Sequence, residues 1–254
     1  MDQQHPKYNE DFLKVRVNPR AGDGKWEYFT TKSGLRLFVQ SWHPEGVVPE
    51  RVLITLHGMS AHGWYYSLLA DELVPYGTSV YSPDYRAHGL SDGFKGDVPD
   101  VWELLEDVKE FVAHIKERHP KAKLYVLGES MGGIVNVNLQ IDPPVKIDGM
   151  LLLAPAIKTT FKFPLREFLM APLYLLTMIF YPRARVIKVT GNERLGMVNE
   201  NNIKYDQDDP LHLKYVTTRY MLGVKKLMDR GQKLGAESIK VPALIIQGGK
   251  DIGV

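Results

Sequence analysis

Short apolar runs rich in β-branched residues alternate along this chain with longer stretches of helical periodicity. This alternation is typical of an α/β protein with a mostly parallel sheet and helices on both faces. The expected strands are residues 26–30, 35–42, 52–56, 79–83, 124–127, 149–153 and 243–247. The length of 254 residues fits a single domain with an insertion.

The clearest helical pattern begins near Pro99. Apolar residues recur from Val101 to Ile115 at the three- and four-residue spacing of one helix face. Pro99 suits the first helical turn, and the pair His119-Pro120 predicts its end.

Between about residues 155 and 236 the alternation stops. A Leu- and Met-rich helical part (165–180), a polar middle (192–209) and a second helical part (211–234) follow one another. This segment holds 14 Lys and Arg against 7 Asp and Glu, a net charge of +7, which leaves 18 against 23, or −5, for the rest. We therefore predict the first part of an α/β core in residues 1–154, a helical cap in 155–236, and a return to the core in 237–254, with a final strand and an acidic turn.

Composition excludes several classes of protein. The absence of cysteine excludes disulfides, zinc fingers and thiol catalysis. A net charge of only +2 argues against a general nucleic-acid-binding protein. The polar start of the chain shows no secretory signal pattern, so we expect a cytoplasmic location. The apolar stretch 168–181 contains Pro172 and is shorter than the ~20 residues that span a bilayer.

The motif with the most chemical content follows the strand at 124–127. It reads Gly128-Glu129-Ser130-Met131-Gly132 and leads into a helix, the pattern of a nucleophile elbow. A sharp turn holds the serine in a strained conformation, and the two glycines avoid a collision where strand and helix meet. The pattern predicts that the hydroxyl of Ser130 is presented above the carboxyl edge of the sheet; a chance occurrence is the alternative.

A second strand, 53–56, ends in His57-Gly58-Met59. This position suits a loop that contributes one donor of an oxyanion hole, the main-chain N–H of Met59, with the N–H of Met131 as the other. The alternative is that His57 and Gly58 form only a tight turn. The third element is the strand at 243–247, which runs through Gly-Gly-Lys into Asp251. A carboxylate there suits the acid that orients a catalytic histidine, although Asp in such a turn is often only a cap.

These motifs resemble the α/β-hydrolase superfamily, and within it the monoacylglycerol lipase and lysophospholipase group. The matching residues are His57-Gly58, the turn at 84–93, the elbow at 128–133, Asp209-Pro210 and the strand and turn at 244–251. The chain departs from the group at Ala87, where relatives usually have Gly. The resemblance implies that Ser130 attacks an ester carbonyl, that a histidine takes its proton, and that Asp251 orients the histidine. It implies no metal or organic cofactor.

The resemblance also implies a catalytic histidine after the acid, and only Ile252, Gly253 and Val254 follow Asp251. We therefore expect the chain to be a fragment, with a missing C-terminal segment or a second chain completing the sheet. An inactive hydrolase-fold binding protein is the alternative. Among the upstream histidines, His62 is the least implausible substitute base, and His212 is similarly remote.

The cap is expected to meet the substrate. Apolar side chains crowd residues 161–181, with basic residues on both sides. The residues expected to bind substrate are His57, Gly58, Phe168, Met170, Leu173 and Met178, although His57 can equally satisfy local backbone groups. This pattern suits peripheral contact with an anionic membrane and a lipid ester substrate; the alternative is a cap that simply roofs the site. Short-chain carboxylesterase and thioesterase activities are the rival reactions.

Overall fold

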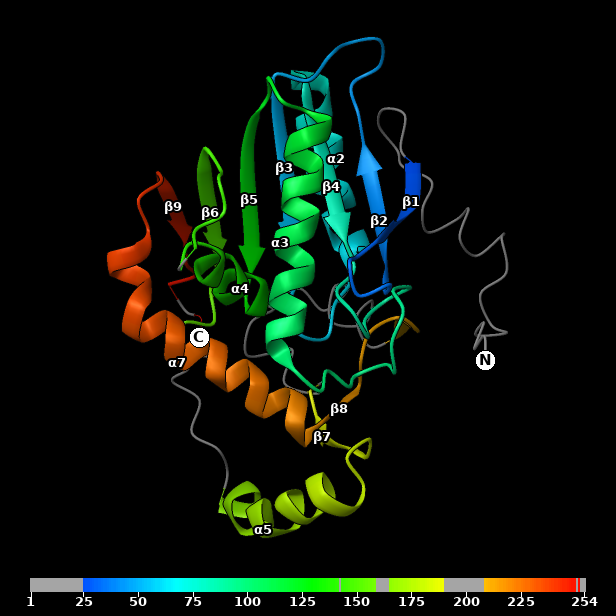
Figure 1. Ribbon diagram of the computed structural model, residues 1–254, viewed down its shortest axis with the longest axis vertical. Coiled ribbons are helices and arrows are strands. Elements are labelled where there is room, and N and C mark those ends of the chain that lie inside the picture. The colour runs from blue at the N-terminus through cyan, green and yellow to red at the C-terminus, as the bar shows by residue number, and fades with distance from the viewer. Residues whose placement is uncertain (1–24, 142, 159–164, 190–207, 250, 252–254) are drawn as a thin grey trace.

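The computed structural model describes residues 25–141, 143–158, 165–189, 208–249 and 251, and it has a seven-stranded sheet at its centre (Figure 1). The strand order is β1-β2-β4-β3-β5-β6-β9, antiparallel between β1, β2 and β4 and parallel from β4 onward. The strands are β1 (Lys25–Thr30), β2 (Arg36–Trp42), β3 (Arg51–Leu56), β4 (Thr78–Pro83), β5 (Lys123–Glu129), β6 (Gly149–Leu153) and β9 (Ala243–Ile246). All seven predicted strands are confirmed to within two residues at each end.

Side chains that alternate along the strands divide the core into two layers. Val52 and Ile54 of β3 point to a large cluster that also contains residues of α3 (Val101–Arg118), α4 (Met131–Leu139) and α7 (Thr218–Ser238). Leu53, between them, points to a smaller cluster beneath α2 (Ser67–Leu73) and its flanking turns η1 (Gly63–Tyr66) and η2 (Val74–Tyr76). Burial on both faces is what central strands of a parallel sheet require.

The long helix α3 begins at Val101, two residues after the predicted start near Pro99. Asp100 caps it, because its side chain accepts a hydrogen bond from the main-chain N–H of Trp102 at 3.0 Å, so Pro99 lies before the helix. His119 is the C-terminal cap, as the sequence predicts.

The segment 155–236 differs in part from its prediction. Helix α5 (Leu165–Phe180) is confirmed, and it lies apart from the sheet beyond α7 (Figure 1). The second helix begins at Thr218 and not at Leu211, because a short ribbon of β7 (Arg185–Lys188) and β8 (Tyr215–Thr217) precedes it and Thr217 caps it. The predicted polar middle falls largely outside the described residues.

Helix α7 crosses the carboxyl ends of the strands and contributes Tyr220, Val224 and Leu227 to the large core cluster. The second helix of the predicted cap is therefore packed into the body of the molecule. The proposed boundaries of the cap itself remain a prediction.

Candidate active site

Ser130 lies in the tight turn between β5 and α4. Its backbone has φ 51° and ψ −113°, a left-handed conformation that is costly for a residue with a side chain. The turn is held by hydrogen bonds: the N–H of Ser130 donates to the Leu153 carbonyl at 3.0 Å, and its own carbonyl accepts from Gly133 and Ala156. The hydroxyl-bearing residue is thus fixed by β6 on one side and by α4 on the other.

The glycines around Ser130 are required by close backbone contacts. A Cβ on Gly128 would lie 2.2 Å from the Gly132 carbonyl oxygen, and a Cβ on Gly132 would lie 1.9 Å from that of Leu56. A Cβ on Gly58 would meet a Glu129 carboxylate oxygen at 2.7 Å. Any side chain at 128 or 132 would push β3, β5 and α4 apart.

Two main-chain N–H groups are available near the turn. Leu56 pairs with Gly128 in the parallel register of β3 and β5, so the loop carrying Met59 begins beside the elbow. Within the described residues, the N–H groups of Met59 and Met131 have no hydrogen-bond acceptor. Met131 is also the first residue of α4, where the helix dipole is positive.

The side chain of His57 lies inside the protein beside the turn after β4. It is fully buried, its Nδ1 donates to the Gly58 carbonyl at 2.7 Å, and its Nε2 accepts from the N–H of Tyr85 at 3.1 Å. Both ring nitrogens are satisfied by the neutral tautomer, and burial holds the pKa of His57 well below its usual value. These contacts agree with the alternative interpretation, in which the ring satisfies backbone groups of the loop. Substrate contact by His57 stays a prediction.

A second buried histidine, His88, links the loop after β3, here called the oxyanion loop because it carries the candidate donor Met59, to Tyr220 of α7. Tyr220 in turn contacts Met131 of α4. The Nε2 of His88 lies 2.7 Å from the Met59 carbonyl oxygen and 3.1 Å from the Tyr220 hydroxyl, which also contacts the Met131 sulfur at 3.1 Å. Its Nδ1 lies 2.9 Å from the Arg86 carbonyl oxygen. Burial lowers the pKa of His88 to about 4, so the ring is neutral at pH 7. His88 and Tyr220 therefore touch both residues that carry the candidate oxyanion donors.

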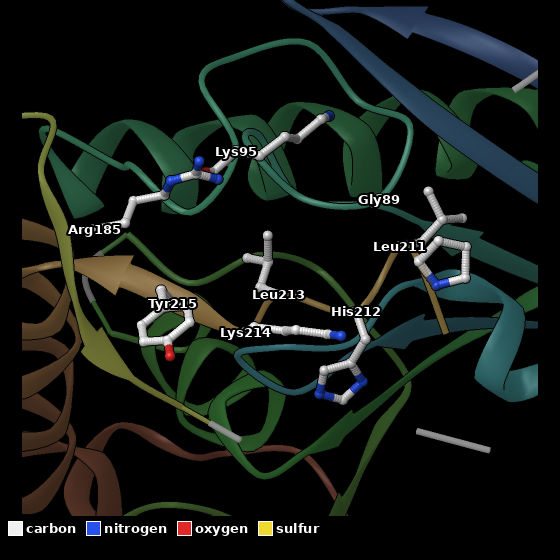
Figure 2. Close-up of a pocket in the computed structure, with 9 residues that line it drawn as sticks. Gly89, Lys95, Arg185, Leu211, His212, Leu213, Lys214 and Tyr215 are labelled. Atoms are coloured by element: carbon white, nitrogen blue, oxygen red, sulfur yellow. The ribbon is translucent and has the colours of Figure 1, made fainter. Parts of the chain in front are cut away.

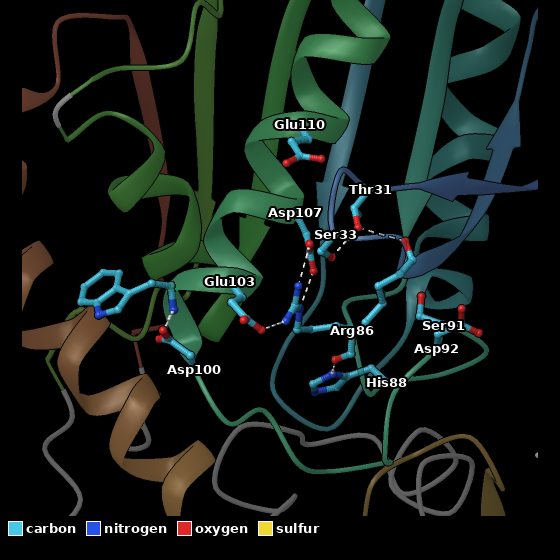
Figure 3. Close-up of polar contacts among 12 residues, drawn as sticks. Thr31, Ser33, Arg86, His88, Ser91, Asp92, Asp100, Glu103, Asp107 and Glu110 are labelled. Carbon is cyan, nitrogen blue, oxygen red and sulfur yellow. Dashed lines mark hydrogen bonds and ion pairs between the residues drawn. The ribbon is translucent and has the colours of Figure 1, made fainter. Parts of the chain in front are cut away.

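The turn that carries His88 is anchored on α3. The Arg86 guanidinium forms a two-bond ion pair with Asp107, at 2.5 and 2.8 Å, and a further pair with Glu103 (Figure 3). Bidentate pairing of this kind fixes both the distance and the plane of the guanidinium. Ala87, in the same turn, has φ 62°, and a left-handed alanine costs on the order of 1 kcal/mol.

A third set of contacts joins the oxyanion loop to residues 209–213. His62 Nε2 lies 3.0 Å from the Asp209 carboxylate, and both side chains are buried. The Leu213 N–H donates to the Ser60 carbonyl at 2.9 Å, and the Tyr65 hydroxyl lies 2.9 Å from His212. His62 and His212, considered as substitute bases, are engaged in these contacts.

The predicted acid lies on the far side of β6. Strands β5 and β9 both pair with β6, with Glu129 and Ile246 flanking Leu153, so Ser130 and Asp251 follow strands that end at the same edge. The Asp251 carboxylate accepts a hydrogen bond from the Gln247 amide at 3.1 Å. Its role in orienting a histidine remains a prediction.

A general base is not found in the described part of the chain, where no hydrogen bond links the Ser130 hydroxyl to a histidine. The remaining described histidines have other neighbours: His43 contacts Ser41 and Ser79, His119 contacts Tyr81, and His114 lies against Phe29.

The substrate-binding residues expected on α5 are only partly described. Leu173 is half exposed, and Met170 and Met178 are partly buried. Phe168 belongs to the helix, but its side chain lies outside the description. The exposed apolar residues of this region are Leu173, Leu175, Leu176, Ile179, Phe180 and Tyr181. No helix among the described residues is long and apolar enough to cross a bilayer.

Comparison with known proteins agrees with this geometry. Residues 48–254 match the family model described as "Serine aminopeptidase, S33", which covers most of the chain. The chain therefore belongs to this family of α/β hydrolases. Its relatives include proteins named as lipases and as an esterase.

Three relatives illustrate the similarity. The monoglyceride lipase homolog of Monkeypox virus is 26% identical over 212 residues, covering 84% of this chain and 74% of the relative. The crystal structure of a Paleococcus ferrophilus monoacylglycerol lipase has a TM-score of 0.69 at 26% identity, covering 82% of this chain and 76% of that one. The human monoglyceride lipase is 29% identical over 141 residues, 53% of this chain and 46% of its own length. The match thus spans less than half of the human relative.

Sequence reasoning missed the contacts behind the site. Tyr220 is one tyrosine in an ordinary amphipathic helix, and nothing in the sequence pairs it with His88. The pair Asp209-Pro210 was a usable signal, because a motif shared with relatives in a polar stretch indicates a specific contact, here with His62.

Proposed function

We propose that this protein cleaves carboxylic esters of lipids, of the monoacylglycerol or lysophospholipid type, through an acyl-enzyme on Ser130. The observation that carries the proposal is the strained conformation of Ser130 near the main-chain N–H groups of Met59 and Met131, which have no hydrogen-bond acceptor among the described residues. Strain at a serine is retained when it positions a nucleophile. Two oriented donors stabilise the negative charge of a tetrahedral intermediate, each by about 3 kcal/mol.

The reaction would proceed in two steps. The Ser130 oxygen attacks the ester carbonyl carbon while its proton passes to a base, and the carbonyl oxygen becomes an anion facing Met59 and Met131. The carbon–oxygen bond to the alcohol breaks, the base returns the proton to the alcohol, and the acyl group stays on Ser130. Water then attacks the acyl-enzyme through the same base, releasing a fatty acid and restoring the hydroxyl.

The base is a histidine outside the described residues, oriented by Asp251. Two observations support this part of the proposal. No described histidine hydrogen-bonds to Ser130, and β9 has an apolar exterior in which Leu244, Ile245 and Ile246 are each more than half exposed. An apolar edge strand of this kind is usually covered by a further strand. A further segment or a second chain would supply both the cover and the histidine.

The substrate is a lipid because α5 offers an apolar surface. Ile179, Phe180 and Tyr181 are 65–72% exposed, and Arg183 and Arg185 follow them directly. Apolar residues next to cations suit insertion of α5 into the interface of an anionic membrane. Acyl chains would then pass to Ser130 past Met170, Leu173 and Met178, and a short-chain ester or thioester would be a poorer substrate.

The decisive experiment measures covalent labelling by a fluorophosphonate and hydrolysis of a monoacylglycerol. Both are measured for these 254 residues and for an extended form that includes any residues the gene encodes after Val254. We expect turnover only in the extended form and its loss, by about 10⁶-fold, in Ser130→Ala. Labelling at another residue, or equal turnover in Ser130→Ala, would contradict the proposal.

A non-catalytic binding protein is the second candidate, favoured by the missing Ser130–histidine hydrogen bond. The same experiment separates the two, because a binding protein would retain lipid without turnover in both forms.

A further inference from the structure

A cavity of about 400 Å³ lies beside the oxyanion loop, between the turn after β4, strand β7 and residues 210–215 (Figure 2). Three of its lining residues are cationic, namely Lys95, Arg185 and Lys214, and none is acidic. The whole protein has a net charge of only +2, so this concentration of positive charge is local. Lys95 and Arg185 line one side of the cavity and Lys214 the other (Figure 2).

Lys95 is the most informative of the three. Its ammonium donates to the carbonyl oxygens of His88, at 3.2 Å, and Ser91, which are neutral acceptors. Within the described residues it forms no salt bridge. The nearest acids serve other donors: Asp84 accepts from the N–H groups of Gly63 and Leu90, and Asp92 is paired with Arg36. Burial lowers the pKa of Lys95 to about 8, which is the effect of a charge held away from water.

Arg185 and Lys214 are also without an acidic partner in the part of the chain that the structure describes. The Arg185 guanidinium lies 5.2 Å from the centre of the Phe94 ring and donates to the Lys95 carbonyl at 3.4 Å. Lys214, which directly precedes β8, is exposed and lines the cavity. A cavity with cations on both sides and no internal counter-charge favours an anionic ligand.

The position of the cavity relates this ligand to the reaction. Leu213, which lines it, donates its N–H to Ser60, the residue that follows the candidate oxyanion donor Met59. The lining also includes Pro210 and Leu211, which give it apolar surface. The cavity therefore lies against the segment that follows Met59.

We propose that this cavity binds the phosphate of a lysophospholipid headgroup and so selects phosphate-bearing lipid esters over monoacylglycerols. This inference rests on the proposed function and specifies its substrate class. A phosphate has several oxygen acceptors and can meet more than one of these cations, while the glycerol hydroxyls of a monoacylglycerol leave all three uncompensated.

The test measures binding by calorimetry to the Ser130→Ala protein, so that it does not depend on turnover. The ligands are octanoyl-glycerol 3-phosphate and mono-octanoylglycerol, both below their micelle concentrations. We expect the phosphate ester to bind about tenfold more tightly at low salt, and the difference to shrink as salt is added. Lys95→Met and Arg185→Gln should each remove most of the difference.

Two further variants keep the result interpretable. Lys214→Gln changes an exposed side chain with little risk to folding and should reduce the preference several-fold. Lys188→Gln, on the same strand as Arg185 but outside the cavity, is the matched control and should retain it. Equal affinity for the two lipids, or a preference that survives in all three cavity variants, would overturn the inference.

Glycerol 3-phosphate and inorganic phosphate distinguish the source of the phosphate. We expect both to bind much more weakly than the lipid, because they lack the acyl chain. If inorganic phosphate binds as tightly as the lipid, the site takes a free anion and the headgroup assignment is wrong. If ester cleavage fails while the phosphate preference holds, the proposed reaction is wrong and the binding site stands.

Discussion

Strands β5 and β9 lie on either side of β6 and carry the two residues that the sequence assigns to catalysis, but their surroundings differ. β5 is largely buried between two layers, and the turn after it packs against β3, β6 and α4 through glycines. All four residues of β9 are exposed, and within the described chain it pairs with β6 alone. The turn that carries Ser130 is thus packed against strands and a helix, while Asp251 follows an exposed strand.

The difference shows which part of the candidate site is held in place by the described residues. Met59 and Met131 pack in the large core cluster, and main-chain hydrogen bonds with Leu153, Gly133 and Ala156 hold Ser130. Asp251 follows β9, which pairs with β6 on one side within the described chain. Four predictions test whether this contrast appears in the free energy of unfolding. They run from the largest expected effect to the smallest.

The elbow should not tolerate the smallest possible side chain. Gly132→Ala places a Cβ 1.9 Å from the backbone oxygen of Leu56, which cannot move without displacing β3. We expect a loss of more than about 3 kcal/mol in the free energy of unfolding, or failure to fold. Urea unfolding measures it, with Gly249→Ala after β9 as the control, since a Cβ there meets nothing within 4 Å. Similar costs at the two glycines would remove the contrast.

This elbow is also the part of the molecule that the sequence predicts best. Gly128, Ser130 and Gly132 stand at fixed spacing after an apolar strand, so local sterics alone determine the turn. The seven strands are predictable for a similar reason, because each is a short apolar run bounded by polar or turn-forming residues. The ribbon of β7 and β8 is not, since three or four residues pairing across a long separation leave no periodic signal.

The region around Ser130, Met59 and Met131 should lose stability in acid. The pKa of His88 is lowered to about 4 in the folded protein, mainly by burial, from an ordinary value near 6.5. The unfolded chain therefore takes up this proton first, so the stability contributed by the neutral ring is present above pH 6.5 and is lost as the pH falls toward 4. We expect a loss of up to about 3 kcal/mol across that window. His57, whose pKa is also lowered by burial, adds in the same direction.

Urea unfolding between pH 7.5 and 4.5 measures this dependence. His88→Gln has no titrating ring, so its stability should fall less steeply with acid than that of the unmodified protein, even if it starts lower. An unchanged slope would mean that His88 is already charged in the folded state, which would contradict its assignment as a neutral ring.

The contacts of His88 mark the limit of prediction from this sequence. His88 could be assigned to a turn that satisfies backbone groups, but not to Met59 across 29 residues or to Tyr220 across 132. Packing of α7 on α4 creates that meeting, and amphipathic periodicity specifies only that α7 has a buried face. The contacts of His57 were beyond prediction for a related reason: a motif gives its position in the chain, while the direction of the ring depends on Tyr85.

Tyr220→Phe tests a single contact within the region around Ser130, Met59 and Met131. It removes only the hydroxyl that contacts His88 and the Met131 sulfur, and keeps the buried ring. We expect a cost of about 1 kcal/mol in the free energy of unfolding. The control is Tyr76→Phe, because Tyr76 is 75% exposed and its hydroxyl is hydrated in any case. Equal effects of the two substitutions would mean that the Tyr220 hydroxyl makes no net contribution.

The smallest effect is expected on β9 and is the most direct test of the contrast. Ile245→Thr alters a side chain that is 60% exposed, so it should change the free energy of unfolding by no more than about 0.5 kcal/mol. The same substitution at Ile54, which is fully buried in β3, should cost about 2 kcal/mol or more, because it removes apolar contacts and buries a hydroxyl. In a form extended through a further strand, Ile245 would become buried and Ile245→Thr should approach the cost of Ile54→Thr. A cost at Ile245 that stays small in the extended form would show that the added segment does not cover β9, and the support for Asp251 would then have to come from elsewhere.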